Sequence, residues 1–180
     1  MDLVWLVPVT GVLSVVFALW LARDVLGRDT GNAAMQDIAG MIFEGAMAFL
    51  RRQYGTIAVL SLVVAVLIAG LVATVSEGVK VIAFDGKTLQ YGATVVEPMR
   101  EGILTGVSFL LGALASGIAG YIGMFIAVRS NIRTAAAAQK SLKDAITVAL
   151  RGGAVSGFLV VAMSLVGVSG LFYVYTAVFG

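Results

Sequence analysis

The chain has 180 residues, of which 60% are hydrophobic and only 12% are charged, and its mean hydropathy is +1.03. Soluble domains carry about a quarter of their residues as charges, so this composition is typical of a membrane protein. Because the chain contains no Cys and no His, disulfides, thiolate nucleophiles, imidazole bases and Cys- or His-ligated metals are excluded, and a net charge of +2 gives no indication of nucleic-acid binding.

Four uncharged runs predict four transmembrane helices in a single transmembrane region, 1–180. About 20 apolar residues in a helix cross the hydrocarbon core of a bilayer. The runs are 3–22, 53–76, 102–128 and 152–180. We expect an all-α membrane protein with helices at about 3–22, 41–76, 100–128 and 146–178, cytoplasmic loops 23–40 and 129–145, and an outer loop 77–99. Asp2, in place of Lys or Arg, argues against a secretory signal at the first run.

Basic residues indicate the orientation. The first and third connections carry nine of them, namely Arg23, Arg28, Arg51, Arg52, Arg129, Arg133, Lys140, Lys143 and Arg151. The second connection carries only Lys80, Lys87 and Arg100. The positive-inside rule therefore places the first and third connections in the cytoplasm and both termini outside. We expect a multi-pass protein of a cell membrane, and the short loops and absence of Cys suit a prokaryotic plasma membrane.

The segment 32–52 is predicted to be a helix that continues into the second span, because Asp37, Glu44 and Arg51 recur at seven-residue spacing. Glu44 precedes Gln53 by nine residues, roughly 13 Å along a helix, and so lies at or outside the interface. A solvated or ion-paired carboxylate is the favoured interpretation of Glu44, and a role in ion movement is the alternative.

The outer loop predicts a small extracytoplasmic β-hairpin. Residues 79–84 and 88–91 are rich in strand-forming side chains, and Asp85-Gly86 between them suits a type I′ turn. Pro98 suits the first turn of the third helix, where its missing N–H is not needed.

Small residues predict close helix packing. In the third helix Ser108, Gly112, Ser116 and Gly120 recur every four residues, and in the fourth helix Gly153 and Gly157 lie next to Gly152 and Ser156. Such faces let helix backbones approach in lipid. A substrate path lined by glycine is the alternative, but helices one, three and four have no charge within their spans to support it.

No residue pattern predicts catalysis or metal binding. The spans lack the charged residues typical of transport sites, and the chain has no Walker-type loop. The basic segment 129–140 follows the third span, where such clusters anchor helices at lipid headgroups. We therefore predict no catalytic, cofactor-binding or metal-ligating residue in this chain.

Several segments, in order along the chain, resemble one family. Residues 31–39 (GNAAMQDIA) and 42–54 (IFEGAMAFLRRQY) are similar to the first cytoplasmic segment of membrane-bound, ion-translocating pyrophosphatases. Residues 123–138 (GMFIAVRSNIRTAAAA) and 150–157 (LRGGAVSG) are similar to the family's segment between its third and fourth helices. The resemblance covers essentially the whole chain.

The resemblance implies a homodimer of sixteen-helix subunits that hydrolyses Mg-pyrophosphate and moves H⁺ or Na⁺ out of the cytoplasm, with K⁺ as a further candidate cofactor. This chain would be the first four helices, in the outer ring, and would be inactive alone. The motifs for Mg²⁺, pyrophosphate and the gate belong to later helices, so no residue here inherits such a role. Arg51 and Arg52, with Glu44 and Asp37, could flank a cytoplasmic funnel that holds pyrophosphate.

The ending at Gly180, without a polar tail, is typical of an N-terminal fragment of a longer protein. The alternative is a stand-alone four-helix membrane scaffold or small transporter subunit. A small transporter of this size would need a carboxylate within a span for proton coupling, and Glu44 lies too close to the cytoplasm for that role.

Overall fold

The computed structural model describes residues 3–76, 79–84 and 89–179. This part of the chain forms a short 3₁₀ turn, four α-helices and two strands. In chain order they are the 3₁₀ turn Leu3–Trp5, α1 (Leu6–Leu26), α2 (Ala33–Val75), β1 (Val79–Phe84), β2 (Leu89–Val96), α3 (Pro98–Ala138) and α4 (Leu142–Phe179). All four helices are long and apolar enough to cross a membrane, so the chain is a multi-pass membrane protein.

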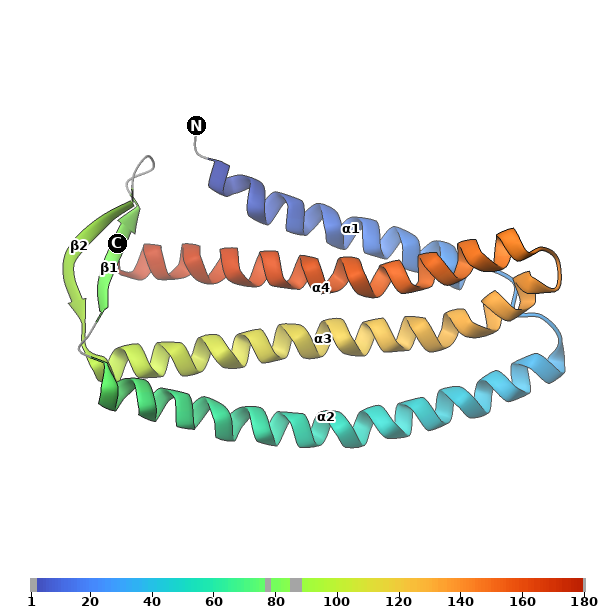
Figure 1. The fold of residues 1–180 in the computed structure, drawn as a ribbon, viewed down its shortest axis with the longest axis horizontal. Helices are drawn as coiled ribbons and strands as arrows, with labels where there is room; N and C mark the ends of the chain where they lie inside the picture. Colours follow the sequence, from blue (N-terminus) through green and yellow to red (C-terminus); the bar gives the residue numbers. More distant parts are fainter. Residues whose placement is uncertain (1–2, 77–78, 85–88, 180) are drawn as a thin grey trace.

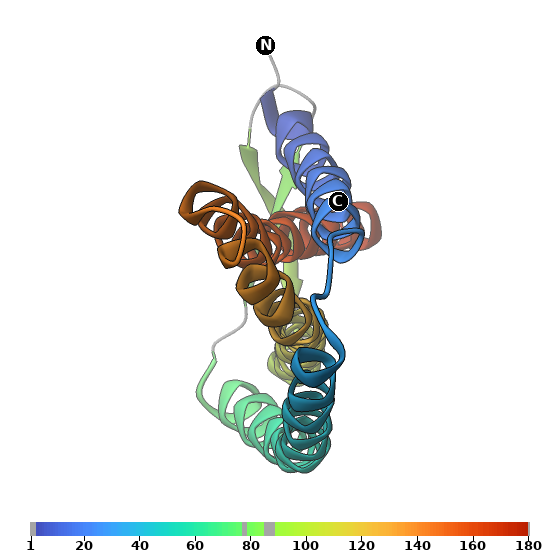
Figure 2. The same cartoon turned by 90° about the vertical axis from the view of Figure 1, so that its right-hand side faces the viewer.

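The helices lie side by side in one layer, in the order α1, α4, α3, α2 (Figure 1). Seen from the end, this row is curved, with α1 and α2 at its two edges (Figure 2). No other element of the described chain covers the two faces of the row. Large apolar side chains therefore project outward, as with Val66 and Leu67 of α2, which are 66% and 65% exposed.

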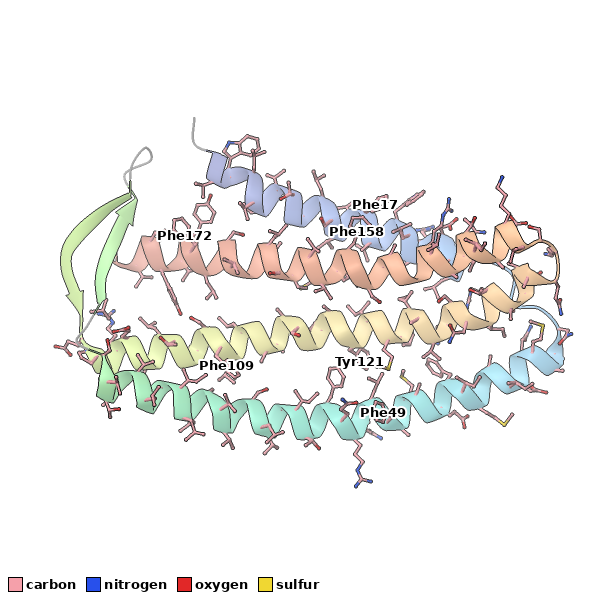
Figure 3. All side chains as sticks on the ribbon, in the orientation of Figure 1. Phe17, Phe49, Phe109, Tyr121, Phe158 and Phe172 are labelled. Atoms are coloured by element: carbon pink, nitrogen blue, oxygen red, sulfur yellow. The ribbon has the colours of Figure 1, made fainter. Side chains whose placement is uncertain are left out.

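The buried core is small and lies where α1, α3 and α4 meet. Its buried members are Ala18, Leu21, Ala119, Ile126, Val155 and Leu159. Beside this cluster, the rings of Phe17 and Phe158 meet edge to face between α1 and α4, with centroids 4.8 Å apart (Figure 3). A core this thin is expected where lipid or further helices, instead of water, cover the remaining apolar surface.

The helices are longer than the uncharged runs indicate. The prediction that 32–52 continues helically into the second span is confirmed. The expected loops 23–40 and 129–145, however, are wrong in extent, because the connections comprise only 27–32 and 139–141. Charged residues mark where the apolar zone stops, but Ala, Arg, Gln and Met in these segments are good helix formers and carry the helices further.

The two strands are antiparallel, with Val79 opposite Val96 and Phe84 opposite Leu89, and the register is irregular between Lys80 and Ile82. They lie in the predicted outer loop. The Asp85-Gly86 turn falls outside the described residues. Helix α3 begins at Pro98, as predicted.

Glycines permit the closest helix contacts, but not all of the predicted ones do so. A Cβ on Gly102 or Gly106 of α3 would touch the backbone of α2 at Ala69 or Ala65. Between α3 and α4, a Cβ on Gly123 would lie 2.7 Å from Ser156 Oγ, and one on Gly152 would lie 2.5 Å from Ser130 Oγ.

Within the described structure nothing lies within 4 Å of a Cβ at Gly153 or Gly157, so these two glycines make no close contact with α1 or α3. Their predicted packing role stays a prediction. These two glycines are on a side of α4 that faces neither α1 nor α3 closely. Gly120 also departs from the expected face, since it lies next to the Tyr54 hydroxyl of α2.

Candidate functional site

Charged side chains gather where the α1–α2 and α3–α4 connections meet, at the right of Figure 1. We call this region the charged end. Its interacting members are Asp24, Arg28, Asp29, Arg133, Lys140 and Arg151.

Asp24 links α1 to α4. Its Oδ2 accepts hydrogen bonds from Arg151 Nη1 at 2.8 Å and from Arg28 Nη2 at 3.0 Å. The side chains of Asp24 and Arg151 are 29% and 36% exposed, so this ion pair is only partly screened by solvent. The Arg151 guanidinium also lies 5.8 Å from the centre of the Trp20 ring. One carboxylate therefore holds two cations, one of them 127 residues away.

Arg133 of α3 caps the C-terminal end of α1. Its Nη2 and Nε donate to the carbonyl oxygen of Leu26 at 2.9 and 3.2 Å. The last carbonyls of a helix lack intrahelical donors and carry partial negative charge, so a guanidinium is favourable there. Together, Asp24 and Arg133 join the end of α1 to both neighbouring helices.

The α1–α2 connection is held by Asp29. Its Oδ1 accepts from the backbone N–H of Gly31 at 3.0 Å, and its Oδ2 accepts from Lys140 Nζ at 2.9 Å. The Gly31 hydrogen bond, followed by the Lys140 interaction, holds the pKa of Asp29 below its usual value, so this carboxylate is ionised at neutral pH. Gly31 has a φ of +74°, which favours glycine.

Side-chain caps begin two of the helices at this end. Asn32 Oδ1 accepts from the backbone N–H of Met35 at 2.9 Å at the start of α2. At the start of α4, Ser141 Oγ accepts from the Asp144 backbone N–H at 3.1 Å and donates to its carboxylate at 2.8 Å. These caps fix where both helices start relative to the charged end.

Glu44 and Arg51, both singled out in the sequence, line one hollow of about 580 Å³ between α2 and α3. Tyr54 and Tyr121 also line it, with ring centroids 6.1 Å apart. Arg52 and Asp37 are not among its lining residues. Because a carboxylate and a guanidinium open into the same hollow, it has no net positive charge that would attract an anion.

Arg129, the first residue of the predicted headgroup anchor, packs against aromatic rings. Its guanidinium lies 4.5 Å from the centre of the Phe125 ring and 5.0 Å from that of Phe43. These cation–π contacts tie α3 to α2 just below the charged end. In the same segment, Arg133 binds the end of α1 and Lys140 binds the α1–α2 connection. The segment therefore stabilises the packing of the helices.

The predicted small-residue face of α3 lines a second groove, of about 800 Å³, between α3 and α4. Ser108, Gly112 and Ser116 are among its lining residues. Ser108 Oγ lies 2.6 Å from the Tyr175 hydroxyl, which donates to the Leu104 carbonyl at 3.0 Å. The lining is otherwise almost entirely apolar, so the groove offers little to a charged substrate.

The described carboxylates do not converge. Over residues 3–76, 79–84 and 89–179, no three His, Cys, Asp or Glu side chains are placed to hold one metal ion. Asp24 and Asp29 instead pair with cations, and sequence reasoning missed both. The four-residue spacing of Asp24 and Arg28 could have indicated their pair, but nothing in the sequence indicates Arg151 as the third member.

Comparison with known proteins places these features in a family. Residues 12–179 match the model of the inorganic H⁺ pyrophosphatase family. The chain belongs to this family. A relative from Moorella thermoacetica, a K⁺-insensitive pyrophosphate-energized proton pump, is 46% identical over 97% of the chain. A K⁺-insensitive pyrophosphate-energized proton pump from Methanosarcina mazei is 39% identical over 96%, and a pyrophosphate-energized membrane proton pump from Arabidopsis thaliana is 36% identical over 91%.

The H⁺ pyrophosphatase relatives are much longer than this chain. It covers 22% of the length of the first two proteins and 20% of the third. No solved structure matches the chain. The activity named for the relatives therefore belongs to proteins about five times as long.

Proposed function

We propose that this chain is the N-terminal, outer-ring part of a pyrophosphate-energised pump that couples hydrolysis of Mg-pyrophosphate to ion export. The observation that carries the proposal is 46% identity, over 97% of the chain, to a protein named as such a pump. The uncovered faces of the helix layer agree with it, because the remaining helices of a larger bundle would bury them.

Within the pump, the role of these helices is structural. At the charged end, Asp24 and Asp29 pair with Arg28, Arg151 and Lys140, and Arg133 binds the Leu26 carbonyl. The described carboxylates form no metal-binding group. By the family resemblance, we assign Mg²⁺, pyrophosphate and the catalytic residues to the parts of the longer relatives that this chain does not cover. The helices would position those parts through packing, and two subunits would form a homodimer.

The transported ion is proposed to be H⁺, without a requirement for K⁺. The support is the naming of the relatives, since those from Moorella thermoacetica and Methanosarcina mazei are both called K⁺-insensitive proton pumps. Na⁺ transport and stimulation by K⁺, which the sequence left open, are not favoured by these names.

The orientation follows from the positive charges. We propose that the charged end faces the cytoplasm of a cell membrane, with Arg23, Arg129 and Arg151 near the lipid headgroups. The N-terminus and the β1–β2 hairpin would then lie outside. In Figure 1 the hairpin and the charged end are at opposite ends of the layer, as this orientation needs.

A comparison of two polypeptides tests the assignment. The product of the native gene, purified in detergent, is expected to be several-fold heavier than 18.6 kDa and to hydrolyse Mg-pyrophosphate, whereas residues 1–180 expressed alone are expected to show no hydrolysis. A native product of 180 residues without hydrolytic activity would favour a stand-alone membrane scaffold.

A further inference from the structure

At the charged end, the uncharged runs of α1, α3 and α4 stop at the same height along the helix axes. We call this height the common level. Asp24, which follows the run of α1, is 2.8 Å from Arg151, which precedes the run of α4. Ser130, one residue after Arg129, lies next to Gly152, one residue after Arg151. On α2 this level falls at Phe43, because the Arg129 guanidinium lies over its ring.

The charges of α2 continue well past that level. Arg51 is eight residues beyond Phe43, about 12 Å along the helix. Tyr54 meets Tyr121, and its ring is 3.7 Å from the Cβ position of Gly117. Arg51 and Arg52 therefore lie level with a part of α3 that is uncharged.

At the end of the layer opposite the charged end, the uncharged run of α2 also lies further from the charged end than the run of α1. Gly11 of α1 packs against Val166 of α4, so the turn Leu3–Trp5 lies level with about residues 172–174. Next to these, Tyr175 contacts Ser108 of α3, and Gly106 contacts Ala65 of α2. Helix α2 continues ten residues beyond Ala65, about 15 Å, to its end at Val75.

We propose that the bilayer crosses this layer obliquely, so that its hydrocarbon slab meets α2 about 12–15 Å further from the charged end than it meets α1. Both ends of the α2 run are displaced by similar amounts, as expected for one slab of constant thickness. Three helix-to-helix steps of 8–10 Å separate α1 from α2. The displacement thus corresponds to a tilt of about 25°, within the range seen for membrane helices.

The oblique slab accounts for Arg51 and Arg52. In an upright slab whose surface passes through Arg23, Arg129 and Arg151, both arginines would lie in hydrocarbon, where an unpaired charge is costly. In the oblique slab they lie at its surface, together with Tyr54 and Tyr121, residues that favour the membrane interface. This inference depends on membrane insertion alone and not on the proposed pump activity.

Depth measurement with spin labels tests the tilt. The chain has no Cys, so single-cysteine variants can be labelled once any cysteines elsewhere in the intact polypeptide are replaced. We choose Leu13→Cys and Val66→Cys, near the middle of the α1 and α2 runs, because both side chains are exposed in the described structure. Collision with oxygen also shows whether each label faces lipid in the intact polypeptide. The control is Gly55→Cys, which has open space at its Cβ and lies level with Leu13. Collision with oxygen and with a water-soluble nickel chelate then reports the depth of each label in vesicles.

The oblique slab predicts equal depths for the labels at Leu13 and Val66, with the label at Gly55 about 15 Å nearer the membrane surface at the charged end. Equal depths at Leu13 and Gly55, with Val66 displaced toward the opposite surface, would show an upright slab and overturn the proposal. Access of the nickel chelate to labels at Val59 and Val63 would place the α2 charges in a water-filled cavity instead, and would also overturn it.

Discussion

Replacing Gly102 with alanine is expected to force α2 and α3 apart. The new methyl group would meet the carbonyl oxygen of Ala69, as well as the backbone nitrogen and Cβ of Ala73 at 3.0 Å. Backbone atoms cannot move aside by changing rotamer, so the helices themselves must shift. Overpacking of this kind costs about 1–3 kcal/mol. The effect is measured as a lower thermal midpoint of the intact protein in detergent, followed by size-exclusion chromatography.

The matched control is Gly70→Ala on α2, near the same contact. Nothing lies within 4 Å of a Cβ at Gly70, and alanine is a better helix former than glycine. The thermal midpoint should therefore stay the same or rise. Equal losses of stability in both variants would contradict the packing of α2 on α3 described above.

Replacing Asp24 with alanine is expected to loosen α1 from the layer. The change leaves the guanidinium groups of Arg151 and Arg28 without their shared carboxylate, at sites that are about one-third exposed. Removal of one partner from a fully buried pair costs more than its loss from a solvated pair. For this intermediate exposure we expect a loss of about 1–2 kcal/mol in the free energy of unfolding, measured by denaturation of the intact protein.

A double-mutant cycle with Arg151→Met separates this link from general effects. If the pair joins α1 to α4, the loss in the double variant should be smaller than the sum of the two single losses. Asp24→Asn, which keeps the shape and one acceptor oxygen, should fall between the native protein and Asp24→Ala. Strictly additive losses would mean that Asp24 and Arg151 do not stabilise the protein through each other.

The sequence predicted four spanning helices and their approximate positions. An uncharged run of at least 20 residues can cross a bilayer as a helix, because a helix satisfies its own backbone hydrogen bonds. Pro98 likewise located the start of α3. The order of the helices across the layer could not be predicted from the sequence. That order depends on contacts such as Asp24 with Arg151, whose partners are 127 residues apart and carry no local pattern.

Helix ends and packing faces were only partly predictable. Charge reports where hydrocarbon stops, so it placed the end of α3 near Val128 although the helix continues to Ala138. Glycine spacing identifies helix faces that can pack closely. It does not identify which of these faces contacts a neighbouring helix. On α4 the adjacent Gly152 and Gly153 differ completely, the first touching Ser130 and the second facing open space.

The contacts of the charged end were also only partly predictable from the sequence. The basic segment 129–140 was recognised from its composition, and its interpretation as a headgroup anchor treated the cations as free for lipid. In the structure Arg133 and Lys140 are occupied by the Leu26 carbonyl and the Asp29 carboxylate. Sequence reveals the cations, but only the fold reveals their partners.

The most direct test of the account is ion uptake by inside-out membrane vesicles that contain the intact polypeptide. Addition of Mg-pyrophosphate, in buffer free of K⁺ and Na⁺, should acidify the vesicle interior, and a protonophore should abolish the gradient. Acidification under these conditions is the result we predict. Hydrolysis of pyrophosphate without acidification in this buffer, with Na⁺ uptake only after Na⁺ is added, would contradict the proposal that these helices belong to a pyrophosphate-driven proton pump. The absence of both hydrolysis and acidification would contradict it as well.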